Sequence, residues 1–307
     1  MTDNANLYAH FQQHFPADLD TPLLFTKEAF TEEGRNADRR SVSYAEADQT
    51  SARIANSLLQ LGAAPGDRIT VQVEKSVENL YLYLACLRAG FVYHPLNTAY
   101  TATELAYFLG NAEPTIVICA SDSLATIESV LLANGEKDKG VKALLTLDAD
   151  GSGSLMQQAA IANIKGEVAH CDGADMAALL YSSGTTGRPK GIMLSHDNLR
   201  KNAETLVETW GFSSSDRLLH MLPIYHVHGL FIGISCVLMS GSSMAWHKGF
   251  NEKEAIESLP DCTVMMGVPT FYTRLLANPD FGQECCSNVR LFISGSAPLL
   301  TETFVEF

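Results

Sequence analysis

The residues best suited to chemistry form one run, residues 181–191, which combines hydroxyl side chains, glycines and a single lysine. Glycines let backbone amides approach an anion closely, and a lysine adds a compact positive charge. The run therefore predicts a loop that binds phosphate groups. Its predicted phosphate-binding residues are Ser182, Ser183, Gly184, Thr185, Thr186, Gly187 and Lys190.

This loop differs from the nucleotide-binding P-loop, in which Gly, Lys and then Ser or Thr open a helix. Here Pro189 precedes Lys190, and Gly191 follows it. Apolar residues 177–180 predict a strand before the loop, and residues 192–194 predict a short strand after it. We therefore expect a hairpin loop, followed by a helix over residues 195–210.

Two histidines, His226 and His228, make residues 222–230 the second candidate segment. Their spacing invites a metal site, but no third Cys, Asp or Glu ligand has suitable nearby spacing. For His228, a purely structural role is at least as good an explanation: a histidine at the start of a helix whose ring is hydrogen-bonded to the backbone. We therefore predict no metal ligands in the chain.

The third segment, residues 266–275, predicts a buried strand that leads into a helix with Pro269 near its first turn. Ligands bind at this edge of open α/β sheets. Helical spacing places Phe271, Arg274 and Leu275 on one face. Arg274 can act as a planar fork for a carboxylate, or its charged head can reach solvent past an apolar stem.

The fourth segment, residues 291–298, predicts a strand that enters a tight turn of small residues before a helix. Small side chains leave room for a flat ring, but an ordinary turn between a strand and a helix explains the pattern equally well. The residues of this turn are Ser294, Gly295, Ser296, Ala297 and Pro298.

Together these segments resemble the adenylate-forming enzymes, a superfamily of acyl-CoA synthetases, luciferases and peptide-synthetase adenylation domains. Residues 181–191 are similar to the family's signature loop, which holds the β- and γ-phosphates of ATP. Within the family, the segments LPIYHVHGL, GVPTFYTRLL and LFISGSAPLL are most similar to malonyl-CoA synthetases. The resemblance implies an ATP-dependent acid:CoA ligase that acts through an acyl-adenylate, with ATP, Mg²⁺ and CoA, on malonate or methylmalonate.

The resemblance also implies roles for individual residues. Lys190 and His226 are the predicted catalytic residues, and His226 would contact or gate the carboxylate. The turn that lines the adenine and the acyl pocket comprises Gly295, Ser296, Ala297 and Pro298. The predicted substrate-binding residues are His226, Gly267, Thr270, Arg274 and Ser294.

The resembled enzymes are longer than these 307 residues. They carry a Thr-Glu pair for the α-phosphate and Mg²⁺, a ribose-binding Asp and a C-terminal domain with a catalytic Lys, which have no counterparts here. The resemblance thus implies the large N-terminal domain without the C-terminal domain, and little ligase activity for this chain alone. The alternatives are a short- or medium-chain fatty acyl-CoA synthetase, transfer to a carrier-protein thiol, or a non-catalytic nucleotide- or acyl-binding module.

The elements that must position these segments alternate between strand and helix, which predicts an α/β fold of layered βαβ lobes. We expect a first lobe over residues 1–175 and a second over residues 176–307. In the first, helices are predicted over 44–61, 77–88, 103–109, 124–132 and 155–163, and strands over 68–74, 91–96, 115–120 and 143–147. In the second, strands are predicted over 218–224, 243–246, 263–268 and 290–294, and helices over 227–239, 253–259 and 271–277.

Composition limits the function classes. The formal net charge of −14 argues against general binding to nucleic acid or to an anionic membrane surface. The strongest apolar run, residues 229–239, falls well short of the roughly 20 residues that span a bilayer. Residues 1–19 have no basic stretch followed by an apolar core, and no CxxC pair is present. We therefore expect a cytoplasmic enzyme whose partners are small molecules: a carboxylic acid, ATP and CoA.

Overall fold

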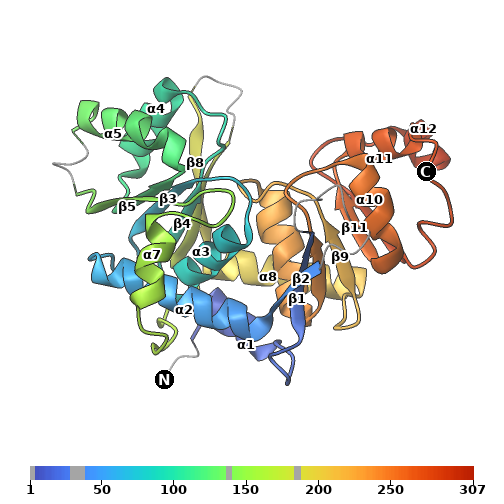
Figure 1. The fold of residues 1–307 in the computed structure, drawn as a ribbon, viewed down its shortest axis with the longest axis horizontal. Helices are drawn as coiled ribbons and strands as arrows, with labels where there is room; N and C mark the ends of the chain where they lie inside the picture. Colours follow the sequence, from blue (N-terminus) through green and yellow to red (C-terminus); the bar gives the residue numbers. More distant parts are fainter. Residues whose placement is uncertain (1–3, 28–38, 136–139, 183–187) are drawn as a thin grey trace. The chain divides into compact units, whose positions relative to one another are not determined.

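The computed structural model describes residues 4–27, 39–135, 140–182 and 188–307 (Figure 1). The described chain forms two compact units. Unit 1 groups Met1–Gln12 with Ala47–Lys201, and unit 2 groups Gln13–Glu46 with Asn202–Phe307. Each unit contains a six-stranded sheet with helices. The predicted α/β class is therefore confirmed.

The sheet of unit 1 has the strand order β6-β5-β3-β4-β7-β8, and only β8 runs antiparallel to its neighbour. Figure 1 shows α4 and α5 on one side of this sheet and α3 and α7 on the other. The strands are β3 Arg68–Gln72, β4 Val92–Pro95, β5 Ile116–Cys119, β6 Ala143–Thr146, β7 Met176–Ser182 and β8 Lys190–Ser195. The helices are α1 Leu7–Gln13, α2 Tyr44–Gln60, α3 Val77–Arg88, α4 Ala102–Ala112, η1 Ser121–Ser123, α5 Leu124–Ala133 and α7 Ser154–Ile161. Helix α8, His196–Trp210, begins in unit 1 and continues into unit 2.

Local sequence explains where the helices of unit 1 begin. The Ser76 hydroxyl accepts from the Asn79 amide and caps α3, whose predicted bounds are confirmed. Thr101 and Glu104 form a capping box at the start of α4. Leu105 and Phe108 of α4 pack in one apolar cluster with Val117 of β5, so burial of this helix face holds α4 on the sheet.

The sheet of unit 2 has the strand order β12-β11-β9-β10-β1-β2, with β2 antiparallel to β1 and the other neighbours parallel. The strands are β1 Pro22–Lys27, β2 Arg39–Ser43, β9 Arg217–His220, β10 Ser243–Trp246, β11 Val264–Gly267 and β12 Leu291–Ser294. The helices are η2 His228–Ile234, α9 Ser235–Ser240, α10 Glu252–Ser258, η3 Leu259–Asp261, α11 Pro269–Leu276 and α12 Thr301–Glu306.

The expected division at residue 175 places the hairpin strands in the second lobe, whereas the structure places them in unit 1. β7 pairs with β4 through Tyr93 and Ala178, and β8 pairs with β7. The polar stretch 148–154 and residues 162–175 connect elements within this unit and do not separate two units. Strands β1 and β2 of unit 2 were also absent from the sequence-based expectations.

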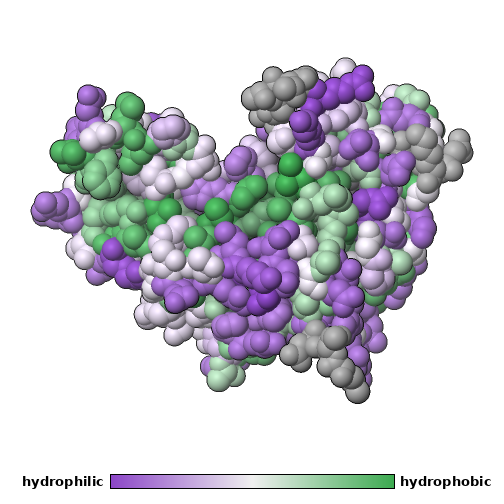
Figure 2. All heavy atoms as spheres, turned by 180° about the vertical axis from the view of Figure 1, so that it is seen from behind, coloured by the Kyte–Doolittle hydropathy of each residue, from purple (hydrophilic) through white to green (hydrophobic). Residues whose placement is uncertain are grey.

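The surface carries hydrophobic as well as hydrophilic residues, and Figure 2 shows one face on which both kinds are visible. Exposed apolar side chains are common on soluble proteins and need no special explanation when they are scattered. Within the described ranges, none of the helices has the length and apolarity that crossing a membrane demands. The large hydrophobic residues with the most exposed side chains are Ile161, Met193, Leu300, Phe304 and Val305.

Candidate functional site

The predicted phosphate-binding loop is held by the β7–β8 hairpin of unit 1, as expected. Ser182 and Lys190 occupy paired positions on the two strands, and both are exposed. Their side chains therefore flank the tip of the hairpin and are available to a ligand. The predicted residues Ser183, Gly184, Thr185, Thr186 and Gly187 lie outside the described part of the chain.

Two tyrosines attach the loop end of the hairpin to α4. The Tyr107 hydroxyl donates to the Pro189 carbonyl (2.6 Å), and the Tyr181 hydroxyl donates to the Asn111 side-chain oxygen (2.6 Å). Burial, followed by the neighbouring Tyr107, raises the pKa of Tyr181 to about 12, so its hydroxyl keeps its proton at neutral pH. Sequence reasoning missed this support, because it links residues 70 and 82 positions apart.

In unit 2, the parallel strands β11 and β12 end at one edge of the sheet and bring two predicted substrate residues side by side. Gly267 and Ser294 are register partners, and the Gly295 amide donates to the Gly267 carbonyl (3.1 Å). The Ser294 hydroxyl is buried and has no hydrogen-bond partner among the described residues. A buried hydroxyl without a partner is costly, so it marks a place where a ligand can supply one.

The turn after β12 has a special backbone conformation. Ser296 has φ = 68°, in the left-handed region that non-glycine residues rarely adopt. A Cβ on Gly295 would lie 3.1 Å from His228 Cε1, so glycine lets the turn approach the imidazole closely. Ser296, Ala297 and Pro298 are exposed, as expected for residues that line a ligand site.

The structure brings His228, and not His226, to this turn. His228 Nδ1 lies 3.2 Å from the Ser296 hydroxyl, and the His228 side chain is buried. Burial and then the neighbouring His226 lower the pKa of His228, so its imidazole is neutral at physiological pH. His226 is exposed, and its role stays a prediction. The sequence presented both histidines but contained no signal for which one contacts the turn.

The segment that carries His228 is a π-helix, which corrects the single α-helix expected over residues 227–239. The His220 Nε2 group donates to the Gly229 carbonyl (2.9 Å), a group that a regular α-helix would pair within itself. A π-turn holds one extra residue and frequently occurs at functional sites. Regular α-helix resumes at α9.

Gly229 is the residue whose lack of a side chain makes this π-helix possible. A Cβ at this position would lie 2.2 Å from the Pro223 carbonyl oxygen, so backbone would have to move. We predict that Gly229→Ala lowers the free energy of unfolding by about 2 to 3 kcal/mol through overpacking. The measurement is the urea unfolding midpoint, compared with that of Gly249→Ala. Gly249 is the control because a Cβ added there would have nothing within 4 Å. Equal midpoints for the two variants would show that the approach to Pro223 is not a constraint.

Arg274 lies on α11 with its side chain about half exposed (52%). Its Nε group donates to the Glu252 carboxylate, and its guanidinium lies over the Phe250 ring at 4.9 Å. The hydrogen bond from Arg274 is the largest cause that lowers the pKa of Glu252. The charged head thus reaches solvent, while Leu275 on the same face is buried. Thr270, one turn earlier, is exposed.

The histidine pair does not form part of a metal centre in the described residues. Among residues 4–27, 39–135, 140–182 and 188–307, no three His, Cys, Asp or Glu side chains gather closely enough to hold an ion. The chemistry that this arrangement supports is anion binding at the hairpin of unit 1 and binding of a small polar ligand at the strand edge of unit 2.

Comparison with known proteins decides the family. Residues 25–307 match the family model described as AMP-binding enzyme. The chain belongs to this family. The AMP-binding enzymes are the adenylate-forming group that residues 181–191 resemble, and the chain corresponds to their N-terminal domain.

Individual AMP-binding enzymes resemble the chain closely. ATP-bound MatB from Rhodopseudomonas palustris superimposes with a TM-score of 0.90 at 44% identity, over 99% of this chain and 57% of that one. Malonate–CoA ligase from Arabidopsis thaliana is 26% identical, over 89% of this chain and 51% of the relative. The long-chain-fatty-acid–CoA ligase FadD13 from Mycobacterium tuberculosis is 28% identical, over 84% of this chain and 50% of the relative. The chain spans about half the length of these relatives.

Proposed function

We propose that the whole protein is an ATP-dependent acid:CoA ligase that works through an acyl-adenylate. The observation that carries the proposal is the β7–β8 hairpin, which pairs Ser182 with Lys190 on either side of residues 183–187. Membership of the AMP-binding enzyme family and the similarity to ATP-bound MatB support ATP as the nucleotide.

In the proposed reaction, a carboxylate oxygen attacks the α-phosphorus of ATP and displaces pyrophosphate. The CoA thiol then attacks the acyl carbon and releases AMP. Lys190, the Ser182 hydroxyl and the loop between them hold the β- and γ-phosphates and offset their charge while the anionic acid approaches. No protein side chain needs to form a covalent bond, because alignment and charge neutralisation supply the catalysis.

The turn after β12 is the proposed site of the adenine and of the acyl group. Gly295, Ser296, Ala297 and Pro298 would line the adenine, and neutral His228 would hold the turn through Ser296. No protein group within the described ranges bonds to the Ser294 hydroxyl, so it is available to the substrate. His226 would contact the carboxylate, which its exposed position allows.

Mg²⁺ accompanies ATP in the resembled enzymes. The described part of the chain offers no group of three metal-ligating side chains. Mg²⁺ would then be held mainly by the ATP phosphates, as is usual for this ion, and would offset part of their charge. The roles assigned above to Lys190, Ser182 and the β12 turn do not depend on it.

Malonate or methylmalonate is the proposed acid. The Arabidopsis relative is named a malonate–CoA ligase, and this similarity supports malonate as the substrate. In this chain, the Arg274 Nη groups have no hydrogen-bond partner among the described residues, so they are available to a second carboxylate. The similarity to FadD13 makes a fatty acid the alternative substrate.

We predict that Arg274→Ala in the whole protein lowers kcat/KM for malonate about 10- to 100-fold and changes the value for propionate little. The reason is that a charge-assisted hydrogen bond to the distal carboxylate is lost, and propionate has no such group. The measurement is the rate of CoA thioester formation with each of five kinds of acid: acetate, propionate, malonate, methylmalonate and longer fatty acids.

Glu252→Gln is the matched control, because it removes the ion pair and keeps the arginine. It should retain the preference for malonate. An equal loss for malonate and propionate in Arg274→Ala would assign the arginine to structure. If only the long-chain acids react, the substrate is a fatty acid, the alternative named above, and not malonate.

A further inference from the structure

Unit 2 contains a second cavity, of about 500 Å³, at the opposite edge of its sheet from the β12 turn. The amino ends of three parallel strands meet there: Asp216 and Arg217 at β9, Ser242 and Ser243 at β10, and Thr263 at β11. The proposed ligase reaction uses the carboxyl ends of the strands, so it leaves this cavity without a role.

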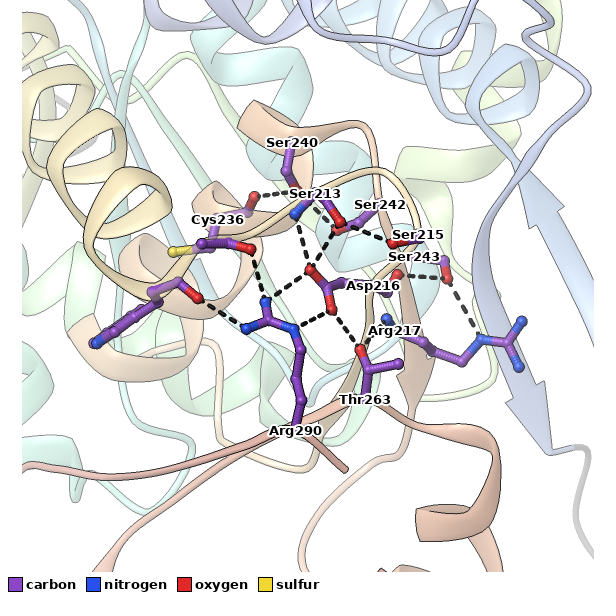
Figure 3. A network of polar contacts seen from close by, with 12 residues as sticks. Ser213, Ser215, Asp216, Arg217, Cys236, Ser240, Ser242, Ser243, Thr263 and Arg290 are labelled. Carbon is purple, nitrogen blue, oxygen red and sulfur yellow. Dashed lines mark hydrogen bonds and ion pairs between the residues drawn. The ribbon is translucent and has the colours of Figure 1, made fainter. Parts of the chain in front are cut away.

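Arg217 contributes a guanidinium group to the wall of this cavity. Its guanidinium lies over the Phe25 ring at 4.0 Å, and its Nε group donates to the Ser243 hydroxyl at the long distance of 3.4 Å. Among the described residues it forms no ion pair. Figure 3 shows its guanidinium directed away from Asp216. Stacking on Phe25 thus orients a planar fork whose two Nη groups remain available to a ligand.

The neighbouring carboxylate, Asp216, does not compensate this charge. Both of its oxygens receive hydrogen bonds from Arg290 at 2.8 Å, and one also accepts from the Thr263 hydroxyl at 2.7 Å (Figure 3). Asp216 and Arg290 together therefore carry no net charge. The other carboxylate on the wall, Asp261, is exposed, so water and salt screen its charge.

The remaining wall is rich in groups that both donate and accept hydrogen bonds. Several of them already bond to protein groups, but a hydroxyl has one donor and two acceptor positions, so hydrogen-bonding capacity remains for the hydroxyls of a polyol. The cavity volume lies within the range of small-molecule sites. These wall residues are Thr21, Ser214, Ser215, Ser242, Ser243 and Asn288.

We propose that this cavity binds a small phosphorylated polyol. The Arg217 fork pairs with the phosphate, since two parallel N–H groups fit two phosphate oxygens. The hydroxyl-lined wall binds the polyol portion. This site is independent of the phosphate-binding hairpin, which lies in unit 1.

The test is isothermal titration of the 307-residue chain with glycerol 3-phosphate, inorganic phosphate and glycerol. We expect saturable binding of glycerol 3-phosphate, weaker binding of phosphate and none of glycerol. Arg217→Met keeps the apolar stem on Phe25 and should weaken glycerol 3-phosphate about tenfold or more, while Arg217→Lys keeps the charge and should give an intermediate loss. Arg53→Met, on α2, should bind as the unaltered chain does.

Lys190→Met distinguishes the two anion sites. The proposal expects it to leave glycerol 3-phosphate binding unchanged, because Lys190 belongs to the hairpin. Loss of binding in Lys190→Met, equal binding in Arg217→Met and the unaltered chain, or equal binding of glycerol would each overturn the proposal. If Arg217→Met does not fold, the comparison of Arg217→Lys with the unaltered chain decides in its place.

Discussion

Replacing Asp216 by Asn is expected to lower the free energy of unfolding by about 2 to 3 kcal/mol, because it removes the buried carboxylate that pairs with Arg290. The Asp216 side chain is 3% exposed. Its oxygens join the start of β9 to Arg290 before β12 and to Thr263 before β11. Burial alone raises the pKa of Asp216, but hydrogen bonds from Arg290 and Thr263 outweigh it and hold the pKa below its usual value. Urea unfolding at pH 7 measures the effect.

Asp197→Asn is the matched control. Asp197 pairs with Arg200 and Lys201 on the exposed surface of α8, where solvent screens the charges. We expect its unfolding midpoint to stay close to that of the unaltered chain. If Asp216→Asn and Asp197→Asn shift the midpoint by the same amount, the Asp216 network does not stabilise the β9–β11–β12 region as described.

Lys190→Met in the whole protein is expected to slow acid-dependent pyrophosphate release by about 10² to 10³, since removal of one electrostatic donor at such a site has this effect. Lys190 is exposed at the end of the hairpin, so the methionine has room and the fold should be retained. Pyrophosphate release under saturating ATP and acid measures the loss, and unfolding in urea checks the fold.

Lys165→Met provides the comparison, because Lys165 is equally exposed but lies in the loop between α7 and β7. It should release pyrophosphate at the unaltered rate. A rate for Lys190→Met that matches Lys165→Met would remove the lysine from the phosphate site, whatever the stability of the two variants.

Much of the fold followed from local patterns in the sequence. The α3 bounds and the hairpin around the phosphate loop are confirmed. These features depend on residues within a few positions of each other, where periodicity, capping groups and turn residues act directly. The candidate loop could be found for the same reason, since its hydroxyls, glycines and lysine are contiguous.

The features that sequence reasoning missed depend on long-range contacts. β1 pairs with β10, more than two hundred positions away, and β7 joins the sheet through β4. The π-helix depends on the approach of His220 and Pro223 to Gly229, and the role of His228 depends on a turn 68 positions later. No local pattern contains this information. Sequence reasoning therefore predicted a regular α-helix in place of the π-helix, and assigned a role to His226 without detecting the contact of His228 with the turn.

The central claim is that the whole protein forms an acyl-adenylate, and acid-dependent exchange of labelled pyrophosphate into ATP tests it most directly. The exchange reports reversible adenylate formation, so it should require the acid and proceed without CoA. We predict exchange with malonate in the absence of CoA, and its reduction in Lys190→Met. Thioester formation that releases ADP and phosphate, with no exchange of pyrophosphate under any acid, would contradict the account.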